Sequence, residues 1–278
     1  MNKIFSRSTF RNCFDNGYDK TYSQVVRRYV DNGTGKQNSE LISQIYNVLR
    51  EGYRNEYYYK NTLLNKLLLG IHSVNTTTAL TEIPIAKSKA DFVLINGKAV
   101  VYEIKTELDN FDRLENQIND YYKAFDHVAV VTCKENLQVL KKKIEMIGKP
   151  VGIYILQKRG TITTIQKPQA YSVELDAEIL FKILRKQEYE EILFNKYKHL
   201  PDVSEFKYYS ECKKMFLEIP LEEAYLSVLK LLKKRSQIIK DEFSKIPYEL
   251  KFLAYFMNLK SDDYKKITKF LNESYGGV

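Results

Sequence analysis

The 278-residue chain contains no tryptophan and only three cysteines and three histidines. Cys13, Cys133 and Cys212 lie far apart, and they form none of the short Cys or His spacings that are typical of zinc sites. The sequence therefore predicts neither a disulfide framework nor a zinc centre. We expect reduced thiols that are buried or inert.

Long uncharged apolar runs are also missing, which argues against a membrane-spanning helix. The first residues, which include Arg7, Arg11 and Asp15, do not form the hydrophobic segment of a signal peptide. The expectation is a cytoplasmic protein with no membrane partner.

Positive charge is in excess. The chain has 44 Lys and Arg against 35 Asp and Glu, which gives a formal net charge of +9. Such an excess favours an anionic partner, and nucleic acid, expected to be DNA, is the first candidate. A lysine-rich composition produces the same excess without such a partner.

The apolar patterns predict an α/β protein with a mixed sheet. Strands are expected at residues 81–85, 91–95, 99–105, 128–132, 151–156 and 161–165. Helices are expected at residues 21–53, with an interruption at 31–38, at 54–69, from a cap at Asp109 or Asn110 to about 125, at 135–147, and at 175–197, 204–217, 221–236 and 248–272.

The strands cease after Pro168, and this change of pattern suggests three segments. We expect an N-terminal helical extension at residues 1–53, an α/β core at 54–168 and a C-terminal helical region at 169–278. The C-terminal helices are the expected contact for a homodimer or another protein partner.

The strand pair that meets near Gly97 carries a group of charged residues. Glu103 and Lys105 lie two residues apart on the second strand, so they share one face of the sheet. Asp91 reaches that face only if the loop has an odd number of residues, because a two-residue turn places it on the other face. We predict a three-residue loop at 95–97 with a left-handed Gly97, or an equivalent bulge near Asp91.

Two carboxylates and a lysine at the edge of a buried sheet are costly to desolvate without partners. A divalent-metal site explains them, because Mg²⁺ and Mn²⁺ prefer carboxylate oxygens. A structural ion pair between Glu103 and Lys105, with Asp91 as an ordinary turn residue, explains them as well.

Neighbouring elements carry four more candidates. Glu56, at the start of the helix at 54–69, lies on the side of its leucine stripe or is a solvated carboxylate favoured by the helix dipole. Gln117 and Tyr121 lie one turn apart on the next helix, where Tyr121 also fits an apolar core stripe. Glu82, a polar residue in an apolar run, either faces the site or, as we expect, pairs with Lys87 or Lys89.

The order of elements and the pattern Asp91, Glu103-Ile104-Lys105 resemble the PD-(D/E)XK nuclease superfamily, with Ala90 in place of the proline. Glu56 is similar to a metal-binding glutamate of that superfamily. The spacing from Gln117 to Tyr121 is similar to the Q-x-x-x-Y motif of its RecB-type branch. The stretch from Asn55 to Thr132 also resembles a group of poorly characterised bacterial proteins assigned to this superfamily. The resemblance covers roughly residues 54–165 and implies a three-layer α/β/α restriction-endonuclease-like core.

This resemblance implies a Mg²⁺- or Mn²⁺-dependent nuclease, of DNA repair or defence, that hydrolyses DNA with a metal-activated water. Asp91, Glu103 and the Ile104 carbonyl would hold the ion, and Glu56 would complete its shell. Lys105 would orient or deprotonate the water, or stabilise charge on the phosphate.

Gln117 and Tyr121 would then contact the DNA backbone or support Lys105. Two other hypotheses compete with the DNA nuclease. One is a nucleic-acid- or partner-binding protein that retains the nuclease fold without turnover. The other is an RNA-directed or defence-type nuclease, because the sequence does not distinguish DNA from RNA.

Overall fold

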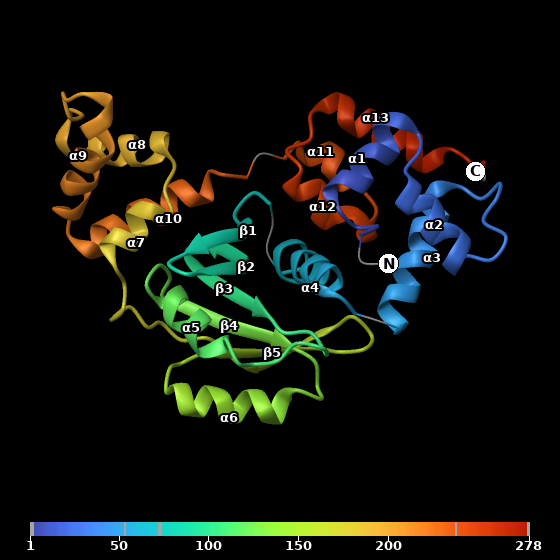
Figure 1. Ribbon diagram of the computed structural model, residues 1–278, viewed down its shortest axis with the longest axis horizontal. Coiled ribbons are helices and arrows are strands. Elements are labelled where there is room, and N and C mark those ends of the chain that lie inside the picture. The colour runs from blue at the N-terminus through green and yellow to red at the C-terminus, as the bar shows by residue number, and fades with distance from the viewer. Residues whose placement is uncertain (1–2, 53, 72–73, 237, 277–278) are drawn as a thin grey trace. The chain divides into compact units, whose positions relative to one another are not determined.

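The computed structural model describes residues 3–52, 54–71, 74–236 and 238–276 (Figure 1). Contacts between Cα atoms divide the chain into two compact units. The first comprises Met1–Val74, Leu156–Ile162 and Gln237–Val278, and the second comprises Asn75–Ile155 and Thr163–Ser236. We call them the helical unit and the sheet unit. These two units are defined by spatial contacts and not by sequence segments. The expected division of the chain into three sequence segments therefore stays a prediction.

The sheet unit contains a mixed six-stranded sheet whose strands follow one another in sequence order. β1 pairs antiparallel with β2, and β2 with β3, whereas β3 to β4 and β4 to β5 are parallel. The strands are β1 (Thr78–Ile85), β2 (Ser88–Asn96), β3 (Lys98–Ile104), β4 (His127–Thr132), β5 (Gly152–Leu156) and β6 (Ile162–Gln166).

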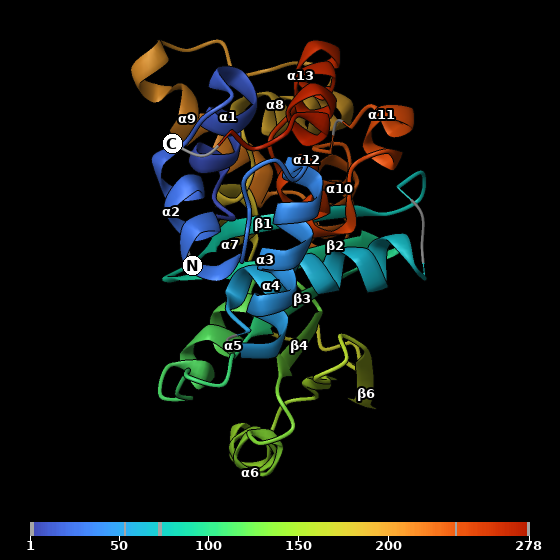
Figure 2. The same cartoon turned by 90° about the vertical axis from the view of Figure 1, so that its right-hand side faces the viewer.

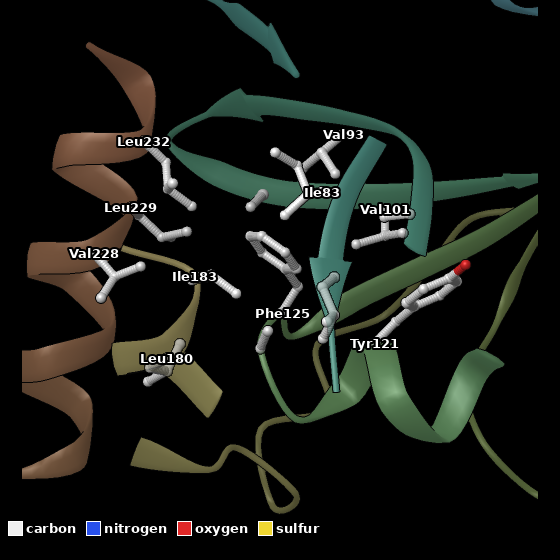
Figure 3. Packing of buried hydrophobic residues seen from close by; sticks show 14 of the residues in the cluster. Ile83, Val93, Val101, Tyr121, Phe125, Leu180, Ile183, Val228, Leu229 and Leu232 are labelled. Carbon is white, nitrogen blue, oxygen red and sulfur yellow. The ribbon is translucent and has the colours of Figure 1, made fainter. Parts of the chain in front are cut away.

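Helices α5 (Leu114–Tyr122) and α6 (Leu137–Ile147) lie on the same side of this sheet (Figure 1). One apolar core joins them to the sheet and to α7 (Ala177–Lys182), α8 (Lys186–Tyr197), α9 (Glu205–Leu217) and α10 (Leu221–Lys233). Figure 3 shows part of this core, in which Phe125 lies between the sheet and Leu229 of α10. The expected partner contact through the C-terminal helices stays a prediction.

The helical unit is built from both ends of the chain. Its elements are α1 (Arg7–Asn16), α2 (Lys20–Tyr29), α3 (Asn38–Gly52), α4 (Glu56–Leu63), the π-helical η1 (Leu64–Leu69), α11 (Lys240–Ser244), the 3₁₀ helix η2 (Tyr248–Leu250), α12 (Lys251–Phe256) and α13 (Ser261–Asn272). α13 contacts both α1 and α3. Among the described residues, no helix has the length and apolar character needed to cross a membrane. The cytoplasmic location stays a prediction.

The structure confirms the α/β class and all six strands, with shifted ends. It also corrects four helices. The helix expected at 175–197 is divided into α7 and α8, and the one expected at 248–272 is divided into η2, α12 and α13. The helix expected at 54–69 turns π-helical from Leu64 onward, and α5 begins at Leu114 instead of after Asp109 or Asn110. The Asp109 carboxylate accepts hydrogen bonds from the backbone and hydroxyl of Thr106, so it closes a local turn and caps no helix.

The loop of the β2–β3 hairpin has an odd number of residues, as predicted. Gly97, with φ of 71°, is the single residue between the strands, and Asn96 lies opposite Lys98. The loop is therefore centred one residue later than predicted, and a plain two-residue turn is not formed. The pair of this ladder farthest from the turn is Phe92 with Tyr102. Asp91 and Glu103 follow this pair and share the opposite face.

Asp120 of α5 joins this helix to the turn between β1 and β2. Its carboxylate accepts hydrogen bonds from the backbone N–H of Lys87 and the hydroxyl of Ser88, and pairs with Lys123 at 2.9 Å. Burial alone would raise the pKa of Asp120, but the hydrogen bonds from Lys123 and Ser88 outweigh it and lower the pKa. Asp120 is 7% exposed, so these bonds contribute to stability.

We expect Asp120→Ala to lower the free energy of unfolding by about 1–3 kcal/mol at neutral pH, because buried donors lose their acceptor. A lowered folded-state pKa means that the ionised carboxylate stabilises the fold above its unfolded pKa and loses this effect as pH falls through the folded pKa. Urea unfolding at a series of pH values should show the difference from wild type shrinking below about pH 4. Asp112→Ala, which changes an exposed carboxylate, is the control; a difference that does not depend on pH would contradict the assignment.

Candidate functional site

The end of β3 places two charged side chains inside the protein. Strand alternation directs Glu103 toward the face covered by α5, where only 3% of its side chain is exposed. Lys105 follows on the same side, with 7% of its side chain exposed, and its Nζ lies 3.0 Å from Glu103 Oε1. The structural ion pair that competed with the metal site is thus formed.

Helix α5 supplies two more members of this group, one helical turn apart. Gln117 donates from Nε2 to Glu103 Oε1 at 2.5 Å and accepts from Lys105 Nζ at 2.9 Å. The Tyr121 hydroxyl lies 2.5 Å from Glu103 Oε2 and 3.0 Å from the Lys89 carbonyl oxygen. Figure 3 shows the ring of Tyr121 near Val101, with its hydroxyl directed away from the apolar cluster. We call Glu103, Lys105, Gln117 and Tyr121 the Glu103 network.

The Glu103 network is nearly closed. A carboxylate offers about four acceptor positions, and three donors already bind Glu103. Burial, together with the neighbouring Glu103 carboxylate, raises the pKa of Tyr121. The hydroxyl therefore keeps its proton near neutral pH and serves Glu103 as a donor. A metal ion at Glu103 would have to use the one remaining position or displace a donor.

Asp91 lies beside this network but has different neighbours. Its Oδ2 accepts a hydrogen bond from the Ile104 backbone N–H at 2.9 Å. One carboxylate oxygen of Asp91 also lies within 4.8 Å of one of Glu82. Glu82 adopts a φ of 58°, which is unusual for a residue in a strand, and it pairs with Lys89 at 2.5 Å, as one of the two predicted partners.

Glu56 belongs to the helical unit. It is the first residue of α4, 57% of its side chain is exposed, and it pairs with Lys60 at 2.5 Å. Glu56 lies at the positive end of its helix, where the dipole favours a carboxylate, and its direction relative to the leucine stripe stays a prediction. Its proposed role as a metal ligand stays a prediction.

Polar residues beyond the sequence prediction also hold the end of β3. Thr132, the last residue of β4, donates to the Lys105 carbonyl at 2.6 Å, and the Lys105 N–H donates to Val131. Asn136 donates to the Thr106 carbonyl. The position of Thr132 at the end of a fully apolar strand was the only sequence signal for these contacts. They fix the backbone on which the Glu103 network is built.

We expect Glu103→Gln and Lys105→Met each to lower the free energy of unfolding by about 3–5 kcal/mol, because each leaves a buried partner without compensation. The double variant should lose less than the sum of the two single losses, by about 1 kcal/mol or more. Chemical denaturation of the four proteins measures this coupling. Additive losses would show that the two charges do not stabilise one another.

Comparison with known proteins gives a family. Residues 50–252 match the family described as bacteriophage P4 protein cII. A curated relative, "Protein cII" of Enterobacteria phage P4, is 24% identical over 143 residues, which are 50% of this chain and 49% of the relative. The chain thus spans about half the length of this relative. No solved structure matches the chain.

These matches correct the functional interpretation of the sequence. Membership of the PD-(D/E)XK superfamily is wrong, and so are the metal-dependent nuclease activity and the role in DNA repair or defence, because the matching family and relative are protein cII. The physical reason for the incorrect interpretation is that a buried ion pair gathers the same kinds of side chain, and the residues of the Glu103 network bind one another. Since the matched segment covers most of the sequence, the chain belongs to the bacteriophage P4 protein cII family.

Proposed function

We propose that this protein is a regulatory nucleic-acid-binding protein, which acts by occupying its target without hydrolysing it. The unequal distribution of charge carries the proposal. The helical unit has 20 Lys and Arg with 12 Asp and Glu, whereas the sheet unit has 24 and 23. Eight of the nine excess positive charges therefore belong to the helical unit. Concentrated positive charge favours a polyanion, because phosphates release bound counterions when they are neutralised.

Two neighbouring cations of the sheet unit, Lys234 and Arg235, are less available to phosphate. Lys234 pairs with Glu191 at 2.7 Å, and Arg235 pairs with Glu188 at 2.6 Å in a partly buried contact. Burial alone would raise the pKa of Glu188. Hydrogen bonds from the Arg235 side chain and the Arg185 backbone outweigh it and lower the pKa, which keeps this pair charged. We therefore assign the nucleic-acid contact to the helical unit.

The sheet serves as a scaffold in this proposal. We propose that it has the arrangement of a restriction-endonuclease-like core, used without turnover. The antiparallel β1–β2–β3 followed by α5 and the parallel β4 supports this arrangement. A shared fold does not carry the chemistry of other proteins with it.

A divalent cation at Asp91 is a separate proposal. Asp91 and Glu82 offer neighbouring carboxylate oxygens, which are suitable ligands for Mg²⁺ or Mn²⁺. Glu103 and the Ile104 carbonyl are the alternative ligands, but three donors already occupy Glu103. The expected site is thus formed by Asp91 and Glu82.

Calorimetric titration with Mn²⁺ tests this site. We expect the heat of binding to disappear in Asp91→Asn and Glu82→Gln but to remain in Glu103→Gln. Asp112→Asn, which removes an exposed charge, should behave like wild type. If wild type takes up no Mn²⁺, the cation proposal fails; if Glu103→Gln, shown to be folded by circular dichroism, also loses the heat, the ion binds Glu103.

Binding to duplex DNA tests the proposed function. Because counterion release drives the contact, affinity for a short fluorescent duplex should fall at least about tenfold between 50 and 200 mM salt. Fluorescence anisotropy measures the affinity, and a gel after incubation with Mg²⁺ should show the duplex intact. The proposal fails if the full chain binds no duplex, single-stranded DNA or RNA at the lower salt concentration.

A further inference from the structure

The first two helices of the chain are joined by a tight turn. α1 ends at Asn16, and Gly17 follows with φ of 69°, a left-handed conformation that glycine adopts without strain. Asp19 then caps α2 by accepting hydrogen bonds from the N–H groups of Thr21 and Tyr22. Two helices joined by a three-residue turn that contains glycine are typical of the helix-turn-helix arrangement.

Buried contacts fix α2 on its neighbours within the helical unit. Tyr22, Val25 and Val26 form its buried side. The hydroxyl of Tyr22 donates to Asn38 Oδ1 of α3 at 2.7 Å, and Asn38 Nδ2 donates to the backbone carbonyl of Phe270 at 2.9 Å. Figure 2 shows α1, α2 and α3 in blue and α13 in red. These contacts fix the position of α2, so the opposite side of the helix is exposed on a rigid support.

That opposite side is polar and basic. Lys20, Gln24, Arg27 and Arg28 are exposed and fall at helical spacing along one face. α2 contains no acidic residue. In the part of the chain that the structure describes, no carboxylate lies within ion-pair distance of Lys20, Arg27 or Arg28, and the Arg28 guanidinium lies over the Tyr29 ring.

The lysines of α13 provide a contrast within the same unit. Lys265 pairs with Asp262, Lys266 with Asp15 and Lys269 with Glu273. A solvated helix face of the ordinary kind mixes both signs in this way. The α2 face carries one sign only, so it can attract a polyanion.

We propose that α1 and α2 form a helix-turn-helix and that α2 is the recognition helix, which enters the major groove of double-stranded DNA. This inference rests on the proposed nucleic-acid binding and names its target. From Lys20 to Arg27 the face extends about 10 Å along the helix axis, which corresponds to about three base pairs. Arg matches the O6 and N7 atoms of guanine, and Gln matches the N6 and N7 atoms of adenine.

The chemistry of this face favours a duplex over single strands. Recognition of single strands uses aromatic side chains on which unstacked bases lie. Within α2, Tyr22 is buried and Tyr29 is half-buried, with the Arg28 guanidinium 5.3 Å from the Tyr29 ring centre; Tyr18, in the turn before α2, is the exposed aromatic residue nearby. The exposed groups that remain are cations and hydrogen-bonding side chains, which suit phosphates and base edges.

The double variant Arg27→Gln/Arg28→Gln tests the assignment against a matched control. Lys141→Gln/Lys142→Gln removes two charges from two consecutive exposed positions of α6 in the sheet unit. We expect the α2 variant to bind duplex DNA at least about tenfold more weakly and with a smaller salt dependence. The α6 variant should change affinity about twofold or less, and thermal melting should show both variants folded.

Gln24→Ala separates base reading from phosphate attraction. Selection from a random duplex library should give wild type a preferred sequence, and Gln24→Ala should relax one position of it with an unchanged salt dependence. If wild type binds but the α2 variant binds equally well, or if single strands or RNA bind as tightly as duplex, the inference is overturned while the proposed function stands. If the arginine variant does not fold, Lys20→Gln/Gln24→Ala provides the same comparison.

Discussion

The buried carboxylate of Glu103 constrains the structure around it, because a charge removed from water must be surrounded by donors. Lys105 supplies one from the same strand, and α5 supplies Gln117 and Tyr121. The register of β3 and the position of α5 on the sheet are therefore fixed together. A shift of either by one residue would remove donors from Glu103 and leave an uncompensated charge in the core.

The sequence predicts those parts of the fold that local periodicity determines. Side-chain alternation required an odd loop at Gly97, and the structure has one. Alternation does not distinguish an odd loop centred on Asn96 from one centred on Gly97, so the predicted loop lay one residue too early. The start of α5 was missed because Asp109 bonds Thr106, and a carboxylate that closes a turn has the same local sequence as one that caps a helix.

The candidate site shows a different limit of sequence reasoning. Helical spacing placed Gln117 and Tyr121 one turn apart, and only the resemblance implied a place beside Lys105. In the structure Gln117 contacts Glu103 and Lys105, and Tyr121 contacts Glu103. The function of the Glu103 network could not be predicted from the sequence, because the side chains that bind a metal ion also form buried ion pairs. Glu56 lies in the first turn of α4, where solvent and the helix dipole favour a carboxylate. The unequal charge of the two units was invisible, because it depends on which distant segments fold together.

The hydrogen bonds of Asn38 have a consequence for biosynthesis. This residue lies near the beginning of the chain, yet it binds the carbonyl groups of Phe270 and Glu273 near the end. The helical unit is thus discontinuous in sequence, whereas the sheet unit is complete once Ser236 has been made. During synthesis all residues of the sheet unit are present before the helical unit is complete, because Asn38 requires the segment that carries Phe270 and Glu273. The hydrogen bonds that hold α3, and through Asn38 the buried side of α2, are therefore completed only after Phe270 and Glu273 have been made.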